Sequence, residues 1–212
     1  MKKLVAIILL LYTFVGFNLY GQFGIANDLV KLELFSSFDK VQKNSEVKLA
    51  LKLKIEEEWH INSNIPNEDF LIPTELIIDS NYVKIINIKY PHAEEVKFSF
   101  SEIPVSVFEG EVFIGAIVSI PESAQLGIYE IPIRLTYQAC NNSTCMAPTD
   151  IDTTLMMQVV DNTSPISEIN SEIFKDLDLS YSQSEIVQIE EEGGIAATLE
   201  SSGILLGLIF VF

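Results

Sequence analysis

The chain has 212 residues, with 30 Asp and Glu against 13 Lys and Arg and a formal net charge of −17. This excess of negative charge argues against nucleic acid and anionic lipid as partners of the soluble part. Between its two apolar ends, the sequence is long enough for one domain with a full hydrophobic core.

The beginning of the chain has the pattern of a secretory signal peptide. A basic start, Met1–Lys3, precedes the apolar run Leu4–Phe17 and a more polar tail that contains Gly21. The run is shorter than the roughly 20 residues that a membrane-spanning helix needs, and an uncleaved anchor is the alternative. We predict a signal peptide over residues 1–21, with the mature chain beginning near Gln22.

The next region, residues 22–160, has the pattern of an all-β domain. Val30–Phe35 and Glu46–Ile55 alternate apolar and charged residues, a period of two that places one face in a core and the other in water. Further β-branched and aromatic segments, separated by turn signals, are expected strands: Trp59–Asn62, Glu75–Asp79, Val83–Tyr90, Lys97–Phe108, Glu111–Ile120, Tyr129–Tyr137 and Asp152–Val160. Because no amphipathic helix separates them, we predict an antiparallel β-sandwich.

After Val160 the composition changes. Residues 161–200 are polar and acidic, which predicts a linker with a short helix near Glu168–Leu177. The segment Gly203–Phe212 is wholly apolar but too short to cross a bilayer about 30 Å thick. We expect residues 201–212 to be the start of a transmembrane helix in a truncated sequence; an apolar tail packed on the domain is the alternative.

The two cysteines of the chain, Cys140 and Cys145, suit a structural staple poorly. A disulfide between them closes a loop of about six residues, which stabilises a fold by roughly 2 kcal/mol, against over 4 for a bridge that spans a domain. The spacing is wider than Cys-x-x-Cys, and zinc would need further ligands that His60 and His92 do not supply at the spacing of known structural modules.

The same pair suits thiol–disulfide exchange better. This chemistry needs one accessible sulfur that becomes a thiolate and a second sulfur that resolves the mixed disulfide. A turn that joins two sandwich strands exposes the sulfurs while the sheets hold their geometry. An inert local disulfide remains the alternative.

The residues around the pair carry a family resemblance. The motif from Tyr137-Gln-Ala-Cys140 to Cys145-x-x-Pro148 resembles the active-site hairpin of the N-terminal periplasmic domain in the DsbD family of thiol:disulfide interchange proteins. The segments Trp59–Asn64 and Phe70–Thr74 also resemble that domain, and the resemblance covers roughly residues 29–160. It implies an immunoglobulin-like sandwich with no cofactor beyond the cysteine pair. The loop is one residue shorter than in the better-known members.

The resemblance also implies roles for individual residues. Cys145 would form the mixed disulfide and Cys140 would resolve it, with Tyr137 as a supporting residue of the motif. His60 and Asn62 share one face of an extended strand, which the family places beside the cysteines. His60 would then stabilise a thiolate or shuttle a proton; a surface histidine next to a core Trp59 is the alternative.

A cap loop is a further implication of the resemblance. In this family an aromatic residue of the loop shields the sulfurs until a partner binds. The matching stretch is Glu94–Ser101, with Phe98 or Phe100 as the shield. The alternative is that both are ordinary strand aromatics on one face.

The predicted function is that of a protein-disulfide reductase module, in the periplasmic part of a bacterial inner-membrane protein. The family implies electron flow from cytoplasmic thioredoxin through a membrane domain and a thioredoxin-like domain of the same full-length protein. The N-terminal domain then reduces periplasmic thioredoxin-fold proteins, namely disulfide isomerases and cytochrome c maturation factors. The alternative is a membrane-tethered immunoglobulin-like binding module with an inert disulfide.

Overall fold

The structure is a computed structural model that describes residues 29–79 and 81–180. The predicted signal peptide, the apolar segment 201–212 and the second half of the predicted linker lie outside the described residues. Within the described part, no helix is long and apolar enough to cross a membrane.

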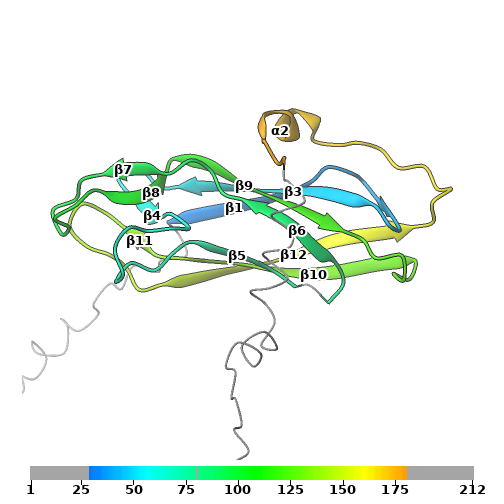
Figure 1. The fold of residues 1–212 in the computed structure, drawn as a ribbon, viewed down its shortest axis with the longest axis horizontal. Coiled ribbons are helices and arrows are strands. Elements are labelled where there is room, and N and C mark those ends of the chain that lie inside the picture. The colour runs from blue at the N-terminus through cyan, green and yellow to red at the C-terminus, as the bar shows by residue number, and fades with distance from the viewer. Residues whose placement is uncertain (1–28, 80, 181–212) are drawn as a thin grey trace, which may run out of the picture.

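The described residues are almost entirely β-structure (Figure 1). The elements in chain order are β1 (Val30–Ser36), β2 (Val41–Gln42), β3 (Glu46–Ile55), β4 (His60–Asn62), β5 (Glu75–Ile78), β6 (Lys84–Lys89), β7 (Glu94–Val96), β8 (Val105–Glu109), β9 (Glu111–Ser119), β10 (Gly127–Tyr137), β11 (Ala139–Cys140), β12 (Thr149–Val160) and α2 (Ser171–Asp176).

Two four-stranded sheets form the body of the molecule. One has the order β1-β3-β9-β6 and the other the order β2-β12-β10-β5, and the named pairings are antiparallel except that of β12 with β2. Because side chains alternate between the two faces of a strand, every second residue points into the space between the sheets. Leu49 and Leu51 from β3 and Ile133 and Leu135 from β10 are all buried in this one core. The predicted antiparallel, immunoglobulin-like sandwich is confirmed.

A third, smaller sheet lies at one end of the sandwich, at the left of Figure 1. Its order is β11-β4-β8-β7, and β4, β8 and β11 adjoin β3, β9 and β10 along the chain. Ile61 of β4 and Ala139 of β11 belong to the main core. Because side chains alternate, His60, Asn62 and Cys140 lie on the other face of this small sheet.

The prediction of one continuous strand over Lys97–Phe108 was wrong. Strand β7 ends at Val96 and β8 begins at Val105, so residues 97–104 reverse the chain. Pro104 has no N–H for a ladder. The Ser101 hydroxyl donates to the carbonyl of Ile103 at 2.7 Å, a local bond that competes with strand pairing.

The segment after β12 packs back on the sandwich. Helix α2 lies over the outer face of the β1-β3-β9-β6 sheet (Figure 1), where Phe174 and Leu179 are buried with Ala50 and Ile117. The first part of the predicted linker is therefore part of the compact domain, which extends to Leu179. Its short helix falls inside the predicted range.

Candidate redox site

Cys140 and Cys145 are joined by a disulfide across a tight turn between β11 and β12. The Asn141 N–H donates to the Thr144 carbonyl at 2.9 Å, and the Met146 N–H donates to the Ala139 carbonyl at 2.8 Å. The cysteines therefore face each other as the non-hydrogen-bonded pair between two hydrogen-bonded rungs. Such pairs hold their side chains close together.

Asn141 shapes the turn itself. Its Oδ1 accepts hydrogen bonds from the N–H groups of Ser143 at 2.9 Å and Thr144 at 3.0 Å. An Asn side chain that bonds the backbone two residues on favours such a turn. The sequence Asn141-Asn-Ser-Thr144 is thus suited to bring the flanking cysteines into register.

The two sulfur-bearing residues differ in exposure. Cys140 is fully buried, at 0% exposed, whereas Cys145 is half-buried. A partner thiol or disulfide that approaches from solvent therefore meets Cys145 first.

Gln138 connects the hairpin to the rest of the site, a role that sequence reasoning missed. Its Oε1 accepts from Asn62 Nδ2 at 3.1 Å and from the Ile72 N–H at 3.2 Å, while its Nε2 donates to the Met146 carbonyl at 3.1 Å. Its place in the Tyr-Gln-x-Cys motif was the available signal. The two partners of its Oε1 lie 66 and 76 residues earlier, so the sequence alone did not indicate them.

The side chain of Asn62 is buried and bonds to the backbone of the 63–74 loop. Its Nδ2 also donates to the Ile72 carbonyl at 2.9 Å, and Thr74 Oγ1 donates to the Asn62 carbonyl at 2.6 Å. Asn62 therefore fastens the 63–74 loop to β4 and to the hairpin through Gln138.

His60 lies at the centre of the small sheet. It pairs in register with Cys140 on one side and with Glu109 on the other, and it is 1% exposed. It is therefore not a surface histidine. Burial lowers the pKa of His60 from its usual 6.5 to about 4, so the ring is neutral at pH 7.

Phe98 covers His60. The two rings stack with centroids 3.9 Å apart and 18° between their planes, and Phe98 also packs with Leu71, Val105 and Val107. Phe100 stacks on Phe98 at 5.3 Å and is half-buried. Of the two predicted cap aromatics, Phe98 is thus the one whose ring stacks on His60.

The cap loop is tied to its surroundings at several points. Ser99 Oγ donates to the carbonyl of Asn142 in the disulfide turn. Asn67 Nδ2 donates to the Pro104 carbonyl at 2.7 Å, and Ser101 Oγ lies 3.1 Å from Glu68 Oε1. The base of the loop therefore rests on the 63–74 loop, while its tip reaches the turn that carries the sulfurs.

Tyr137 lies on the core side of the hairpin. It is buried in the main core, and burial raises its pKa to about 12, so the phenol is neutral at pH 7. Alternation places it on the face opposite to Cys140. The structure therefore puts it beneath the site rather than beside the sulfurs.

A groove runs beside the disulfide turn. It is lined by His60, Phe98, turn residues 141–143 and the carboxylates of Glu56–Glu58 and Glu109. No Lys or Arg is among the described residues that line it. The side of the site that adjoins His60 is therefore acidic.

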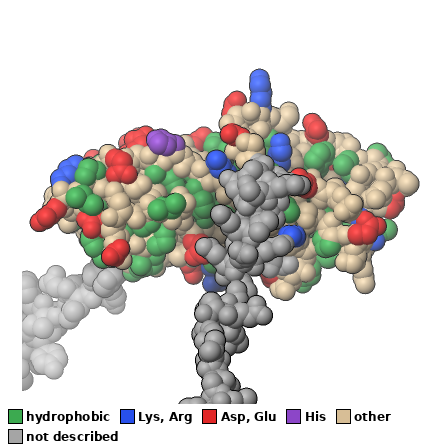
Figure 2. Space-filling model, viewed as in Figure 1, with side chains coloured by type: hydrophobic (Ala, Val, Ile, Leu, Met, Phe, Trp, Pro, Cys, Tyr) green, Lys and Arg blue, Asp and Glu red, His purple; other side chains and the backbone are tan. Residues whose placement is uncertain are grey.

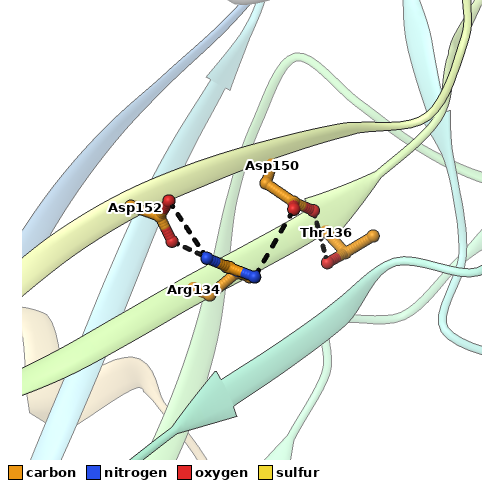
Figure 3. A network of polar contacts seen from close by, with 4 residues as sticks. All are labelled: Arg134, Thr136, Asp150 and Asp152. Carbon is orange, nitrogen blue, oxygen red and sulfur yellow. Dashed lines mark hydrogen bonds and ion pairs between the residues drawn. The ribbon is translucent and has the colours of Figure 1, made fainter.

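The carboxylates of Asp150 and Asp152, just after the hairpin, interact with Arg134 and Thr136 and not with the cysteines. Arg134 on β10 donates through Nε to Asp152 at 2.7 Å and forms an ion pair with Asp150 at 3.7 Å (Figure 3). Thr136 Oγ1 also donates to Asp150, at 2.7 Å. This network lies on the outer, solvent side of the β10–β12 pair, away from the core.

The described residues offer no metal centre: no group of three or more His, Cys, Asp or Glu lies close enough to hold an ion. The redox chemistry available at this site is that of the cysteine pair.

Comparison with known proteins agrees with this geometry. Residues 27–156 match the family model described as "Thiol:disulfide interchange protein DsbD, N-terminal". The comparison with curated proteins gave no match.

Two solved structures are similar. The N-terminal periplasmic domain of ScsB from Proteus mirabilis has 18% identity and a TM-score of 0.46, with 61% of this chain and 47% of that chain covered. The chain thus spans about half the length of that structure. The reduced N-terminal domain of Neisseria meningitidis DsbD has 14% identity and a TM-score of 0.40, with 68% and 98% covered. Since the family model covers more than half of the chain and includes the disulfide hairpin, the chain belongs to the family of DsbD N-terminal domains.

Proposed function

We propose that this protein is the periplasmic thiol–disulfide exchange module of a transmembrane disulfide reductase. The observation that carries the proposal is the unequal disulfide: a fully buried Cys140 bonded to a half-buried Cys145 on a capped hairpin. Membership of the DsbD N-terminal family supports the same chemistry.

Exchange proceeds in two steps that balance in electrons. In the reduced protein the Cys145 thiolate attacks one sulfur of a partner disulfide and displaces the other as a thiolate, which leaves a mixed disulfide. Cys140 then attacks Cys145, reforms the Cys140–Cys145 bond and releases the partner with both sulfurs reduced. The reverse sequence, started by a reduced thioredoxin-like domain, recharges the module.

The cap loop would control the access of partner proteins to the disulfide. Phe98 is buried over His60, and Ser99 is bonded to the turn that carries the sulfurs. A partner that reaches Cys145 would displace the tip of this loop. The cap thereby protects the pair from small oxidants and reductants while it is closed.

The remaining parts of the chain fit a relay. We propose a signal peptide over residues 1–21, a redox domain from residue 22, an acidic linker up to residue 200 and the entry to a membrane domain at 201–212. Because Phe174 and Leu179 are buried on the sandwich, the free part of this linker would begin at about residue 180 rather than 161. Electrons would arrive from a thioredoxin-like domain of the full-length protein and leave to periplasmic disulfide isomerases and cytochrome c maturation factors.

A redox titration tests the proposal. Exchange-active pairs such as those of thioredoxin and disulfide isomerase have potentials of about −270 and −180 mV, whereas structural disulfides typically lie below about −300 mV. We expect the folded protein to equilibrate within the first range. A disulfide that is reduced only after unfolding would instead favour the binding module with an inert bridge.

A further inference from the structure

A row of side chains crosses the small sheet beside the disulfide. The register pairs Glu109 of β8 with His60 of β4, and His60 with Cys140 of β11. Residues directly opposite on neighbouring antiparallel strands share a face, with Cβ atoms about 4.5–5.5 Å apart. His60 is therefore the cross-strand neighbour of Cys140.

One atom in this row lacks a partner. His60 Nε2 is buried and has no hydrogen-bond partner among the described residues. Buried polar atoms in native proteins are usually hydrogen-bonded, so an exception calls for an explanation. In the disulfide form Cys140 has no hydrogen to donate, whereas reduction gives Cys140 an S–H donor at the position paired with His60.

Cys140 needs a proton acceptor of its own. The residue is 0% exposed, so water cannot take up its proton directly, and burial disfavours a free thiolate. Cys145 is half-buried and can lose its proton to solvent. The two sulfurs therefore differ in how they are activated.

We infer that His60 is the general base that activates Cys140 in the resolving step, an inference that rests on the proposed function. When the mixed disulfide at Cys145 has formed, His60 Nε2 accepts the Cys140 thiol proton as the Cys140 sulfur attacks Cys145 Sγ. The Cys140–Cys145 bond forms, the bond to the partner breaks, and the partner leaves as a thiolate. The imidazolium then returns its proton to the departing thiolate or to solvent.

The surroundings of His60 suit this role. The charged groups that face it are carboxylates: Glu109 on β8, Glu56–Glu58 from the turn before β4, and Glu94 on β7, whose charge acts on Glu109. Phe98 stacks over the ring and limits the access of water. The low pKa of His60, about 4, belongs to the disulfide form. A thiolate at Cys140 would stabilise the imidazolium and raise that pKa.

The test separates the two chemical steps. The reduced protein is mixed in a stopped-flow instrument with a nitrobenzoate disulfide reagent, whose released thiolate is yellow. Attack by Cys145 releases the first equivalent, and resolution by Cys140 releases the second. The first phase tests the proposed function, and the second tests the role of His60.

We expect His60→Gln to slow the second phase about 100-fold at pH 7, within the range of general base catalysis, and to change the first phase less than threefold. The second phase of the wild type should vary little between pH 6 and 8. In the variant it should rise about tenfold per pH unit, because only the thiolate fraction of Cys140 then reacts. His60→Phe, which keeps a ring against Phe98, should behave alike.

The exposed His92 provides the matched control, since His92→Gln should leave both phases unchanged. A second phase that keeps its rate and its flat pH profile in His60→Gln would overturn the inference.

Discussion

At the scale of single residues, the chemistry of the site depends on an asymmetry between two cysteines. Cys140 ends a strand in the interior of the small sheet, whereas Cys145 follows the turn and remains partly accessible. A sulfur that water reaches ionises more easily than one that it does not. Under the proposed function, this difference in exposure would separate an attacking Cys145 from a resolving Cys140.

The first prediction concerns this division of labour. Reduced Cys140→Ser should accumulate a stable mixed disulfide with an oxidised Cys-x-x-Cys protein, because Cys145 attacks and nothing resolves the product. Cys145→Ser is the matched variant and should trap little or none. The mixed species is measured on a non-reducing gel. Equal trapping by both variants would contradict the assignment of roles.

The second prediction concerns acid stability. The pKa of His60 is about 4 in the folded oxidised protein and about 6.5 when unfolded. Its contribution to stability is therefore fully present above about pH 6.5 and is lost as the pH falls towards 4 and below. The loss amounts to about 3 kcal/mol at pH 4.

Thermal unfolding of the oxidised protein between pH 7 and 4 measures this effect. The stability of the wild type should fall more steeply than that of His60→Gln, and His92→Gln should follow the wild type. Parallel curves for the wild type and His60→Gln would show that His60 does not titrate in this way.

At the scale of elements, the cap loop and α2 are both short segments that pack on a face of a sheet. The cap covers the outer face of the small sheet through Phe98, and α2 with the residues after it covers the outer face of the β1-β3-β9-β6 sheet through Phe174 and Leu179. Each is held by few buried side chains, so we expect each to open at a lower free energy than the sandwich unfolds.

The third prediction distinguishes the two cap aromatics. Phe98→Ala should raise the rate at which a small thiol reduces the disulfide by about tenfold, because the cap then opens more often. Phe100→Ala, the matched change, should alter it less than twofold because Phe98, not Phe100, is the ring stacked on His60. The rates follow from thiol labelling at fixed times. A larger effect at Phe100 would identify that residue as the shield.

The fourth prediction concerns the docking of the segment after α2. A Cβ at Gly115 of β9 would overlap Leu179 Cδ2. Gly115→Ala should therefore displace Leu179 and destabilise the protein by about 1–3 kcal/mol. Limited proteolysis should then cleave near residue 180 faster.

Leu179→Ala leaves space for the added methyl group. The double variant should consequently lose less stability than the sum of the two single variants, since residues in contact are not additive. Additive losses would mean that the two residues do not share this contact.

At the scale of the whole molecule, the dominant property is the negative charge. The acidic side chains spread along the visible face of Figure 2 rather than gather in one patch, and further carboxylates line the groove beside the disulfide. A field of one sign accelerates encounters with partners of the opposite sign.

The fifth prediction follows from this field. Mixed-disulfide formation with a positively charged Cys-x-x-Cys protein should slow as salt rises from about 10 to 150 mM, because the Debye length falls from about 30 to 8 Å. An uncharged small disulfide should react at nearly constant rate. The same salt dependence for both reagents would remove charge steering as an explanation.

Much of this molecule was predictable from local patterns. The period-two alternation of Glu46–Ile55 indicated β3 with its bounds, and the motif around Cys140 and Cys145 indicated a hairpin. By contrast, the predicted strand Lys97–Phe108 is interrupted where Ser101 bonds to the Ile103 carbonyl and where Pro104 lacks an N–H. The spacing of apolar residues reveals neither feature. Local patterns report which face a residue occupies, not which distant segment meets it.

The sequence by itself therefore determined the sandwich, the cysteine pair and the family, because alternation and short motifs are properties of neighbouring residues. Only the tertiary structure decided that Phe98 rather than Phe100 covers His60, that Gln138 joins the hairpin to the 63–74 loop, and that Leu179 packs against β9. These contacts join segments many residues apart. Their geometry follows from sheet order and register, which no single segment encodes.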